Sequence, residues 1–289
     1  MFDTRLKEAA QLVEQNLAEI MNRLGNISVV HAMRYATTGG KRLRAFLVLE
    51  SARLHEVPCE QAIWPATAIE AIHAYSLVHD DLPCMDDDAL RRGLPAVHVR
   101  WDECTAVLAG DALHSLGFEC VANAACHSNP AVRTELCLTL ARAAGARGMV
   151  QGQALDIAAE TAPNPLTLSE ITHLQAGKTG ALFSWSATAG AVMAQADTAP
   201  LRRYAEDLGL AFQIADDILD IEGNVEKLGK AVRKDADAGK ATFVSLLGME
   251  AAKSRARDLI ENACDALTPY GNNAETLREA ARFVISRDN

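Results

Sequence analysis

The residues most suited to chemistry are two short runs of aspartate. The first, at residues 80–88, holds five aspartates in nine positions, at 80, 81, 86, 87 and 88. Carboxylates this close repel one another unless cations neutralise them. The run follows an apolar segment, 71–78, so we expect it at the end of a buried helix and not on an open surface.

The second run lies within residues 213–220 and has helical spacing. Asp216 and Asp220 are four positions apart, so an α-helix places them on one face, where like charges destabilise it unless a cation binds. One acidic run alone is typical of solvated surface, but two runs in apolar surroundings favour a hard divalent cation such as Mg²⁺. An EF-hand calcium loop is excluded, because counting from residue 86 gives no glycine at the sixth position and no glutamate at the twelfth.

Basic residues occur where an anionic substrate would need them. One group follows the pair Gly39-Gly40, and another follows the first aspartate run. His73 lies seven positions before Asp80, which returns it to nearly the same helical face, although such a histidine is equally compatible with the core. The basic candidates are Lys41, Arg42, Arg44, Arg91 and Arg92.

The chain as a whole is acidic, with a formal net charge of −10 and a pI near 5.3. A surface of this sign repels phosphate backbones, so we expect no nucleic-acid partner. A small polyanionic substrate would need local neutralisation by divalent cations or by a few focused basic residues. The sequence offers both.

Cysteine usage and hydropathy indicate where the protein works. Seven cysteines form no C-x-x-C pair and are odd in number, which favours a reducing, cytoplasmic compartment. Residues 1–5 open an amphipathic helix and do not read as a signal peptide. The 18 residues of 179–196 carry no formal charge, but they are rich in Ala, Ser, Thr and Gly and predict a buried helix. We therefore expect no stable membrane insertion.

Composition and periodicity predict an all-α chain. It has 52 alanines against nine prolines, with no strand-like alternation and no solenoid repeat. Pro83 must kink or end the helix that leads into the first aspartate run. No linker divides residues 1–289, which predicts a single domain. Helices are predicted at 2–24, 45–54, 61–80, 102–123, 130–144, 147–160, 168–176, 179–196, 199–221, 241–267 and 274–286.

Taken together, these features resemble the trans-prenyl diphosphate synthase family, and within it the bacterial short-chain farnesyl diphosphate synthases. The resemblance covers essentially the whole chain and implies the isoprenoid synthase fold, a single polyprenyl synthetase domain of roughly ten or more helices around a central cavity. The motifs, in the family's order and spacing, are Gly39-Gly40-Lys41-Arg42-Leu43-Arg44, Asp80-Asp81-x4-Asp86 running into Arg91-Arg92-Gly93, Gly177-Lys178-Thr179-Gly180, and Asp216-Asp217-x2-Asp220.

The resemblance implies five catalytic residues that bind metal or leaving group. Asp80 and Asp86 would bind two Mg²⁺ ions and Asp216 a third, giving about three ions per active site. Arg91 and Lys178 would bind the diphosphate of the allylic substrate. Together these groups would stabilise the negative charge that develops as that diphosphate leaves.

The remaining implied residues contact the two substrates. Those for isopentenyl diphosphate, the five-carbon nucleophile, are Lys41, Arg44, His73 and Arg92. Those for the allylic substrate are Arg91, Lys178, Thr179 and Gln213, with Lys230 and Lys240 closing over its diphosphate. The last two belong to a glycine-punctuated segment, 222–240, which is compatible with a lid or with a plain solvated loop.

The implied reaction is a Mg²⁺-dependent head-to-tail condensation. The allylic C–O bond ionises, the double bond of isopentenyl diphosphate attacks the cation, and a proton passes to the departed diphosphate. Successive use of dimethylallyl and geranyl diphosphate gives the C15 product, farnesyl diphosphate. Tyr75 and its neighbour Ser76 are the implied chain-length residues. Tyr75 lies about 7.5 Å along a helix from Asp80, at ~1.5 Å per residue.

Several alternatives stay open. The product could be the C10 geranyl or the C20 geranylgeranyl diphosphate, and Tyr75 could be simply a core residue. On a straight helix Asp87, not Asp86, would share the face of Asp80. Asp86 can therefore be the metal ligand only if the helix is distorted near Pro83. A terpene cyclase would need no second diphosphate site, so the basic segments 39–44 and 91–93 argue against it. A non-catalytic subunit of a heteromeric synthase would typically lack one aspartate run, whereas both are intact here. A homodimer is expected because the relatives dimerise.

Overall fold

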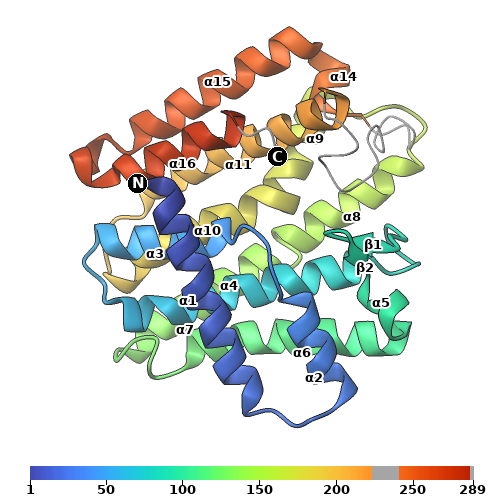
Figure 1. Cartoon of the computed structure of the whole chain (residues 1–289). Coiled ribbons are helices and arrows are strands. Elements are labelled where there is room, and N and C mark those ends of the chain that lie inside the picture. Colours follow the sequence, from blue (N-terminus) through green and yellow to red (C-terminus); the bar gives the residue numbers. More distant parts are fainter. Residues whose placement is uncertain (223–240, 287–289) are drawn as a thin grey trace. The chain divides into compact units, whose positions relative to one another are not determined.

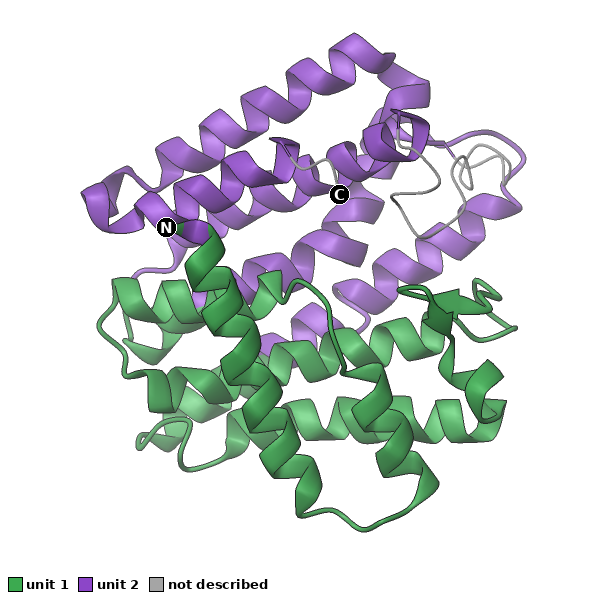
Figure 2. Ribbon diagram, viewed as in Figure 1, with its two compact units in different colours: residues 1, 3–138, 189–196 green, residues 2, 139–188, 197–289 purple. Residues whose placement is uncertain are grey.

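The computed structural model describes residues 1–222 and 241–286, where the regular structure is helical apart from one small hairpin (Figure 1). More than ten α-helices occur there, which confirms the all-α expectation. Tertiary contacts divide the chain into two compact units, coloured separately in Figure 2. Unit 1 comprises residues 1, 3–138 and 189–196, and unit 2 comprises residues 2, 139–188 and 197–289.

Unit 1 is built around one central helix, α4 (Cys59–Asp80), which is buried on all sides and packs between α3 and α6. Glycines of α6 allow the close approach, because a Cβ on Gly117 would lie 2.7 Å from the side chain of Ile72 on α4. The other elements of unit 1 are α1 (Phe2–Asn22), α2 (Ser28–Ala36), α3 (Leu43–Leu54), β1 (Leu90–Arg91), β2 (Leu94–Pro95), α5 (Val97–Arg100), α6 (Glu103–Ala122) and most of α7 (Pro130–Ala144). The two strands pair antiparallel.

Unit 2 is organised along α11 (Ala199–Glu222), which packs against both α15 and α16. The buried Tyr204 hydroxyl of α11 donates to the carbonyl oxygen of Leu277 at 2.8 Å, which fixes α11 to α16. The other elements are α8 (Met149–Glu160), α9 (Leu168–Gln175), the π-helical turn η1 (Ala176–Gly180), the first part of α10 (Ala181–Met193), α14 (Phe243–Leu247), α15 (Met249–Ala266), the 3₁₀ segment η2 (Thr268–Ala274) and α16 (Glu275–Ser286).

Most predicted helices are found, and the differences have physical causes. The helix at 130–144 is confirmed to the residue, and α4 ends at Asp80, as Pro83 requires. The helix predicted at 241–267 is divided into α14 and α15 at Gly248, whose φ of 81° only glycine adopts at low cost. The helices predicted at 168–176 and 179–196 form one helical run, because the wider π turn η1 carries the chain through Gly177. Helix α2 and the hairpin were not predicted.

The structure also bears on two expectations about environment. Within the described ranges, no helix is both long and apolar enough to span a bilayer. The uncharged segment that predicts a buried helix forms part of η1 and α10, where most residues are indeed buried. All seven cysteines lie in the described residues and are free thiols.

Candidate active site

The first aspartate run lies where α4 ends and the chain folds back on itself. The backbone N–H of Asp86 donates to the carbonyl oxygen of Asp80 at 2.8 Å, and the N–H of Asp87 donates to that of Leu82 at 3.2 Å. Asp87 takes a left-handed φ of 51° and is exposed, whereas Asp80 and Asp86 are half-buried. The turn therefore supplies the distortion near Pro83 that a straight helix lacks, and it places the backbone of Asp86 beside that of Asp80.

Asp81, the second residue of this run, has a different role. Its side chain is only 3% exposed and forms an ion pair with Arg91 of β1, whose Nε lies 3.0 Å from Oδ1. Arg91 also contacts Asp88 at 3.5 Å. Burial raises the pKa of Asp81, and the hydrogen bonds from Arg91 oppose this shift. The pair fixes the guanidinium of an expected substrate-binding residue.

In the second aspartate run, which lies in unit 2, the second aspartate is again buried and bonded to protein. Asp217 is buried, and its Oδ2 accepts the backbone N–H of Phe243 at 2.8 Å, at the start of α14. Its Oδ1 accepts from Gln213 Nε2 at 3.3 Å, and Gln213 Oε1 in turn accepts from the hydroxyl of Thr179 at 3.3 Å. The two expected substrate contacts, Thr179 and Gln213, are thus bonded directly to each other, and the buried carboxylate of Asp217 holds the amide of Gln213.

Both runs therefore divide their aspartates in the same way. The second aspartate of each run, Asp81 or Asp217, is buried and bonded to protein, while Asp80, Asp86 and Asp216 remain half-buried. In the described part of the chain, no group of three or more His, Cys, Asp or Glu side chains could hold a metal ion by itself. The half-buried carboxylates of Asp80, Asp86 and Asp216 are of the kind that Mg²⁺ uses, because this ion is usually bound by one or two carboxylates together with substrate phosphates and water.

Lys178 is placed by a very close contact between η1 and α8. A Cβ on Gly152 of α8 would lie 2.0 Å from the backbone nitrogen of Lys178, so only glycine fits there. The Nζ of Lys178 lies 2.7 Å from Oδ2 of Asp156, also on α8. Sequence reasoning missed Asp156. The available signal was an isolated acid in the apolar helical segment 149–159, four residues after a glycine.

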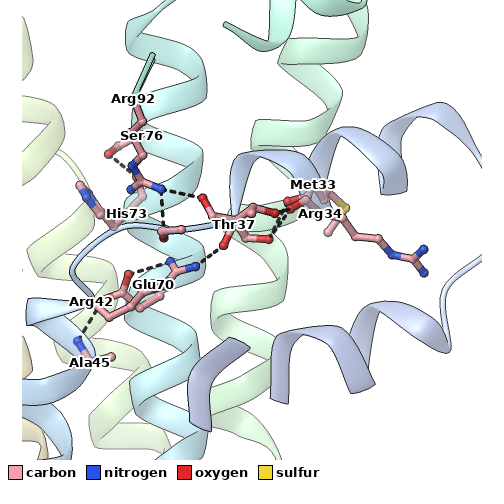
Figure 3. Close-up of polar contacts among 11 residues, drawn as sticks. Met33, Arg34, Thr37, Arg42, Ala45, Glu70, His73, Ser76 and Arg92 are labelled. Carbon is pink, nitrogen blue, oxygen red and sulfur yellow. Dashed lines mark hydrogen bonds and ion pairs between the residues drawn. The ribbon is translucent and has the colours of Figure 1, made fainter. Parts of the chain in front are cut away.

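Arg42 and Arg92 both bond to the loop between α2 and α3 (Figure 3). Arg92 Nη1 donates to the carbonyl oxygens of Thr38 and Gly39 at 3.0 and 3.1 Å. Gly40 has a φ of 92°, and a Cβ there would lie 2.8 Å from Arg92 Nη2. Arg42 is buried in a left-handed conformation with a φ of 55°, a strain of about 1–3 kcal/mol that neighbouring contacts must offset. The glycines and Arg42 thus shape a loop that accepts a guanidinium on its carbonyls.

His73 lies among these arginines and is neutral. Burial lowers its pKa well below 6.5, and the charges of Arg44, Arg92, Arg42 and Arg91 lower it further. The four guanidiniums therefore lie within electrostatic range of the imidazole. The structure thereby brings together four expected residues, His73, Arg44, Arg91 and Arg92, and the exposed Lys41 lies on the same loop. We refer to Lys41, Arg42, Arg44, His73 and Arg92 as the basic cluster.

Tyr75 is buried on α4 against aromatic neighbours. Its ring meets the edge of His114 on α6 at 4.8 Å between centroids and that of His79 at 5.8 Å. Burial, together with the charge of Asp80, raises the pKa of Tyr75 to about 12, so the phenol stays protonated. The half-buried Ser76 donates its hydroxyl to the carbonyl oxygen of His73. Lys230 and Lys240 lie outside the described residues.

Comparisons with known proteins match the chain along nearly its whole length. The polyprenyl synthetase family model matches residues 28–280. A farnesyl diphosphate synthase of Escherichia coli is 42% identical, with 98% of this chain and 96% of that protein aligned.

Solved structures are similar over the same extent. An FPP/GFPP synthase from Zymomonas mobilis is 46% identical, with a TM-score of 0.90 and 98% of each chain covered. A geranyltransferase from Helicobacter pylori, solved in complex with magnesium and isoprenyl diphosphate, is 32% identical. Its TM-score is 0.80, with 98% of this chain and 96% of that chain covered.

The neutral state of His73 predicts a pH dependence of stability. Because the folded-state pKa lies below that of an unfolded histidine, near 6.5, the unfolded chain binds an extra proton as the pH falls below 6.5. The free energy of unfolding should then fall by up to about 1.4 kcal/mol per pH unit, and His73→Gln should remove this contribution. Urea unfolding between pH 7.5 and 5.0 measures the difference, with the exposed His31→Gln as control. Equal slopes for the wild type and His73→Gln would contradict the assignment.

Proposed function

Because this chain belongs to the polyprenyl synthetase family, we propose that it condenses isopentenyl diphosphate head to tail with dimethylallyl and then geranyl diphosphate. The chain is a prenyltransferase that elongates prenyl chains in the manner of farnesyl diphosphate synthases. The proposed main product is the C15 farnesyl diphosphate. The observation that carries the proposal is the presence of two aspartate runs, each with half-buried outer aspartates, together with a separate basic cluster.

The allylic diphosphate is proposed to bind through magnesium. Asp80 and Asp86 would hold two Mg²⁺ ions and Asp216 a third, about three in all, with phosphate oxygens and water completing the coordination. When bound, Mg²⁺ would stabilise the negative charge that develops on the leaving diphosphate. The half-buried positions of these three carboxylates fit this use of the metal.

The protein itself would supply fixed positive charge to the same leaving group. Arg91 and Lys178 would bind the allylic diphosphate, and their carboxylate partners Asp81 and Asp156 would hold both side chains in place before substrate arrives. Thr179 and Gln213 would lie near the reacting carbon. Lys230 and Lys240 are proposed to cover the diphosphate.

Isopentenyl diphosphate is proposed to bind without metal. Lys41, Arg44 and Arg92 would neutralise its diphosphate, and His73 would contribute a neutral imidazole to the same pocket. No dedicated side-chain base is needed, because the proton lost in the final step passes to the departed diphosphate. The two substrates would thus be distinguished by how their diphosphates are held.

Product length is proposed to be limited by Tyr75, with Ser76 beside it. The buried ring is backed by His114 of α6, so a growing chain that reached it would meet a packed wall. A relative named for two products, the Zymomonas mobilis FPP/GFPP synthase, shows that product length varies among similar proteins. A C10 or C20 main product is therefore the alternative within this function.

The setting of the enzyme is also a proposal. We propose that residues 1–289 act as one synthase domain, in line with a family match that extends across both units. Exposed apolar side chains on α5 and α6, at Val99, Val107 and Leu108, support a homodimer. The free thiols fit a reducing cytoplasm, and the acidic net charge argues against nucleic acid.

Product analysis tests the proposed function directly. The protein incubated with isopentenyl and dimethylallyl diphosphates and Mg²⁺ should form mainly C15 diphosphate, identified by mass spectrometry. Addition of a chelator should abolish product. If no prenyl product forms with Mg²⁺ present, the proposed function is wrong. A C10 or C20 main product would show that the enzyme is a prenyl synthase with a product of different length from the one proposed.

The metal roles predict large losses of rate. Asp80→Asn and Asp216→Asn should each lower turnover at least a hundredfold, because one Mg²⁺ ligand loses its charge while the side-chain volume is kept. Circular dichroism should show an unchanged fold. Asp207→Asn, on the same helix as Asp216, is the matched control. Near-normal turnover of either test variant would refute its role as a metal ligand.

The chain-length role predicts a change of product and not of rate. Tyr75→Ala should shift the main product from C15 to longer chains, because the ring that ends the pocket is removed. Tyr75→Phe keeps the ring and should keep C15. Mass spectrometry of both product mixtures gives the comparison, and C15 output from Tyr75→Ala would exclude Tyr75 as the stop.

A further inference from the structure

The basic cluster contains one buried carboxylate for which the proposed reaction has no use, that of Glu70. The residue lies on α4 one turn before His73, and its side chain is 3% exposed (Figure 3). A buried carboxylate is unfavourable unless it is paired and hydrogen-bonded. Its contacts therefore indicate what it does.

Glu70 bonds to both sides of a proposed substrate ligand. Its Oε2 lies 3.1 Å from Nη1 of Arg42, and its Oε1 accepts the backbone N–H of Ala45 at 3.0 Å. Arg44 lies between these two positions. One carboxylate on helix α4 thus bonds to residues two positions before and one position after Arg44.

Arg42 extends this connection to the preceding loop. Its other guanidinium nitrogen, Nη2, donates to the carbonyl oxygen of Thr37, and Thr37 is fixed to α2 through its hydroxyl bond to Met33. Arg92 donates to the next two carbonyl oxygens, those of Thr38 and Gly39. The carbonyls of residues 37–39 therefore all accept from guanidiniums, and Glu70 supports this loop through Arg42 (Figure 3).

The charges of the cluster explain why such a support is needed. Arg42, Arg44 and Arg92, together with the neighbouring Arg91, lie close enough to the His73 imidazole for their charges to lower its pKa, and they repel one another when no anion is bound. Glu70 is close enough to Arg92 for its charge to raise the pKa of that arginine, against the lowering caused by burial and by Arg42. A buried ion pair is weak evidence for fold stability, since well-packed apolar residues often replace one at no loss. A role in arranging neighbouring cations accounts better for the pair and for the left-handed backbone of Arg42.

We propose that Glu70 and Arg42 form a positioning pair that sets the diphosphate-binding geometry of Lys41, Arg44 and Arg92 before isopentenyl diphosphate binds. The proposal rests on the proposed function of the basic cluster. Neither residue of the pair contacts the reacting carbons, and neither is a metal ligand. The pair acts on one substrate only, because the allylic diphosphate is held elsewhere by Arg91, Lys178 and magnesium.

Glu70→Gln tests the pair with little change of volume. The glutamine can still accept from the N–H of Ala45, but it no longer neutralises Arg42. The KM for isopentenyl diphosphate should rise at least tenfold, while the KM for the allylic substrate should stay within twofold of the wild type. If the role of Glu70 were purely structural, fewer molecules would be folded. The apparent kcat would then fall, and both KM values would stay unchanged.

A matched control and a second variant keep the test decisive. Glu50→Gln is the control, because Glu50 is another buried glutamate of unit 1 that pairs with Arg53 and lines a separate pocket together with residues of α1. The KM values of Glu50→Gln for both substrates should equal those of the wild type. If Glu70→Gln does not fold, the double variant Glu70→Gln/Arg42→Gln removes both charges and leaves none buried alone. It should fold and show the same selective rise in KM.

The outcomes distinguish failure of the positioning pair from failure of the proposed function. A wild-type enzyme that makes no prenyl product would refute the proposed function. An active wild type with unchanged KM for isopentenyl diphosphate in the folded variants would refute the positioning pair alone. Loss of folding in both variants would also refute it, since the pair would then serve the stability of unit 1.

Discussion

Repulsion between like charges is the constraint that shapes both units. The chain concentrates aspartates in two runs and guanidiniums around one loop, and neither arrangement is stable by itself. The structure meets this constraint in part with single buried or half-buried counter-charges. Asp81 faces Arg91, Asp156 faces Lys178, and Glu70 faces Arg42. Each pair lowers the repulsion while leaving the groups proposed to bind diphosphate or metal at half-buried or exposed positions.

The same constraint explains why adjacent aspartates differ. Side chains of neighbouring residues on a helix project about 100° apart. When the first aspartate of a run lies at the boundary of the core, the side chain of the second can therefore point into the core. Asp217 enters unit 2 and accepts the first N–H of α14, which connects the end of α11 to the helix that follows the undescribed segment. Asp81 enters unit 1 and fixes Arg91 of the hairpin. A neutral side chain could fill either space, but it would not hold these donors as strongly.

Much of the fold and of the candidate site could be predicted from the sequence, because helix periodicity and motif spacing are local properties. The helix at 130–144 and the gathering of His73, Arg44 and Arg92 are examples. The distinction between Asp86 and Asp87 depends on a turn after Pro83, which periodicity does not describe. Helix α2 is only nine residues long, and each strand of the hairpin has two, so their patterns are too short to identify. Glu70 and Asp156 were missed because their importance comes from partners distant in sequence.

The central claim is that the basic cluster binds one diphosphate by fixed positive charge alone, whereas the aspartate runs bind the other through metal. Calorimetric titration of isopentenyl diphosphate into the protein, in the presence of a chelator, tests this claim most directly. The account predicts binding that persists without Mg²⁺ and weakens as salt is added, because fixed charges are screened. A dimethylallyl diphosphate titration in chelator should show no such binding. If isopentenyl diphosphate failed to bind until Mg²⁺ was restored, the claim would be contradicted.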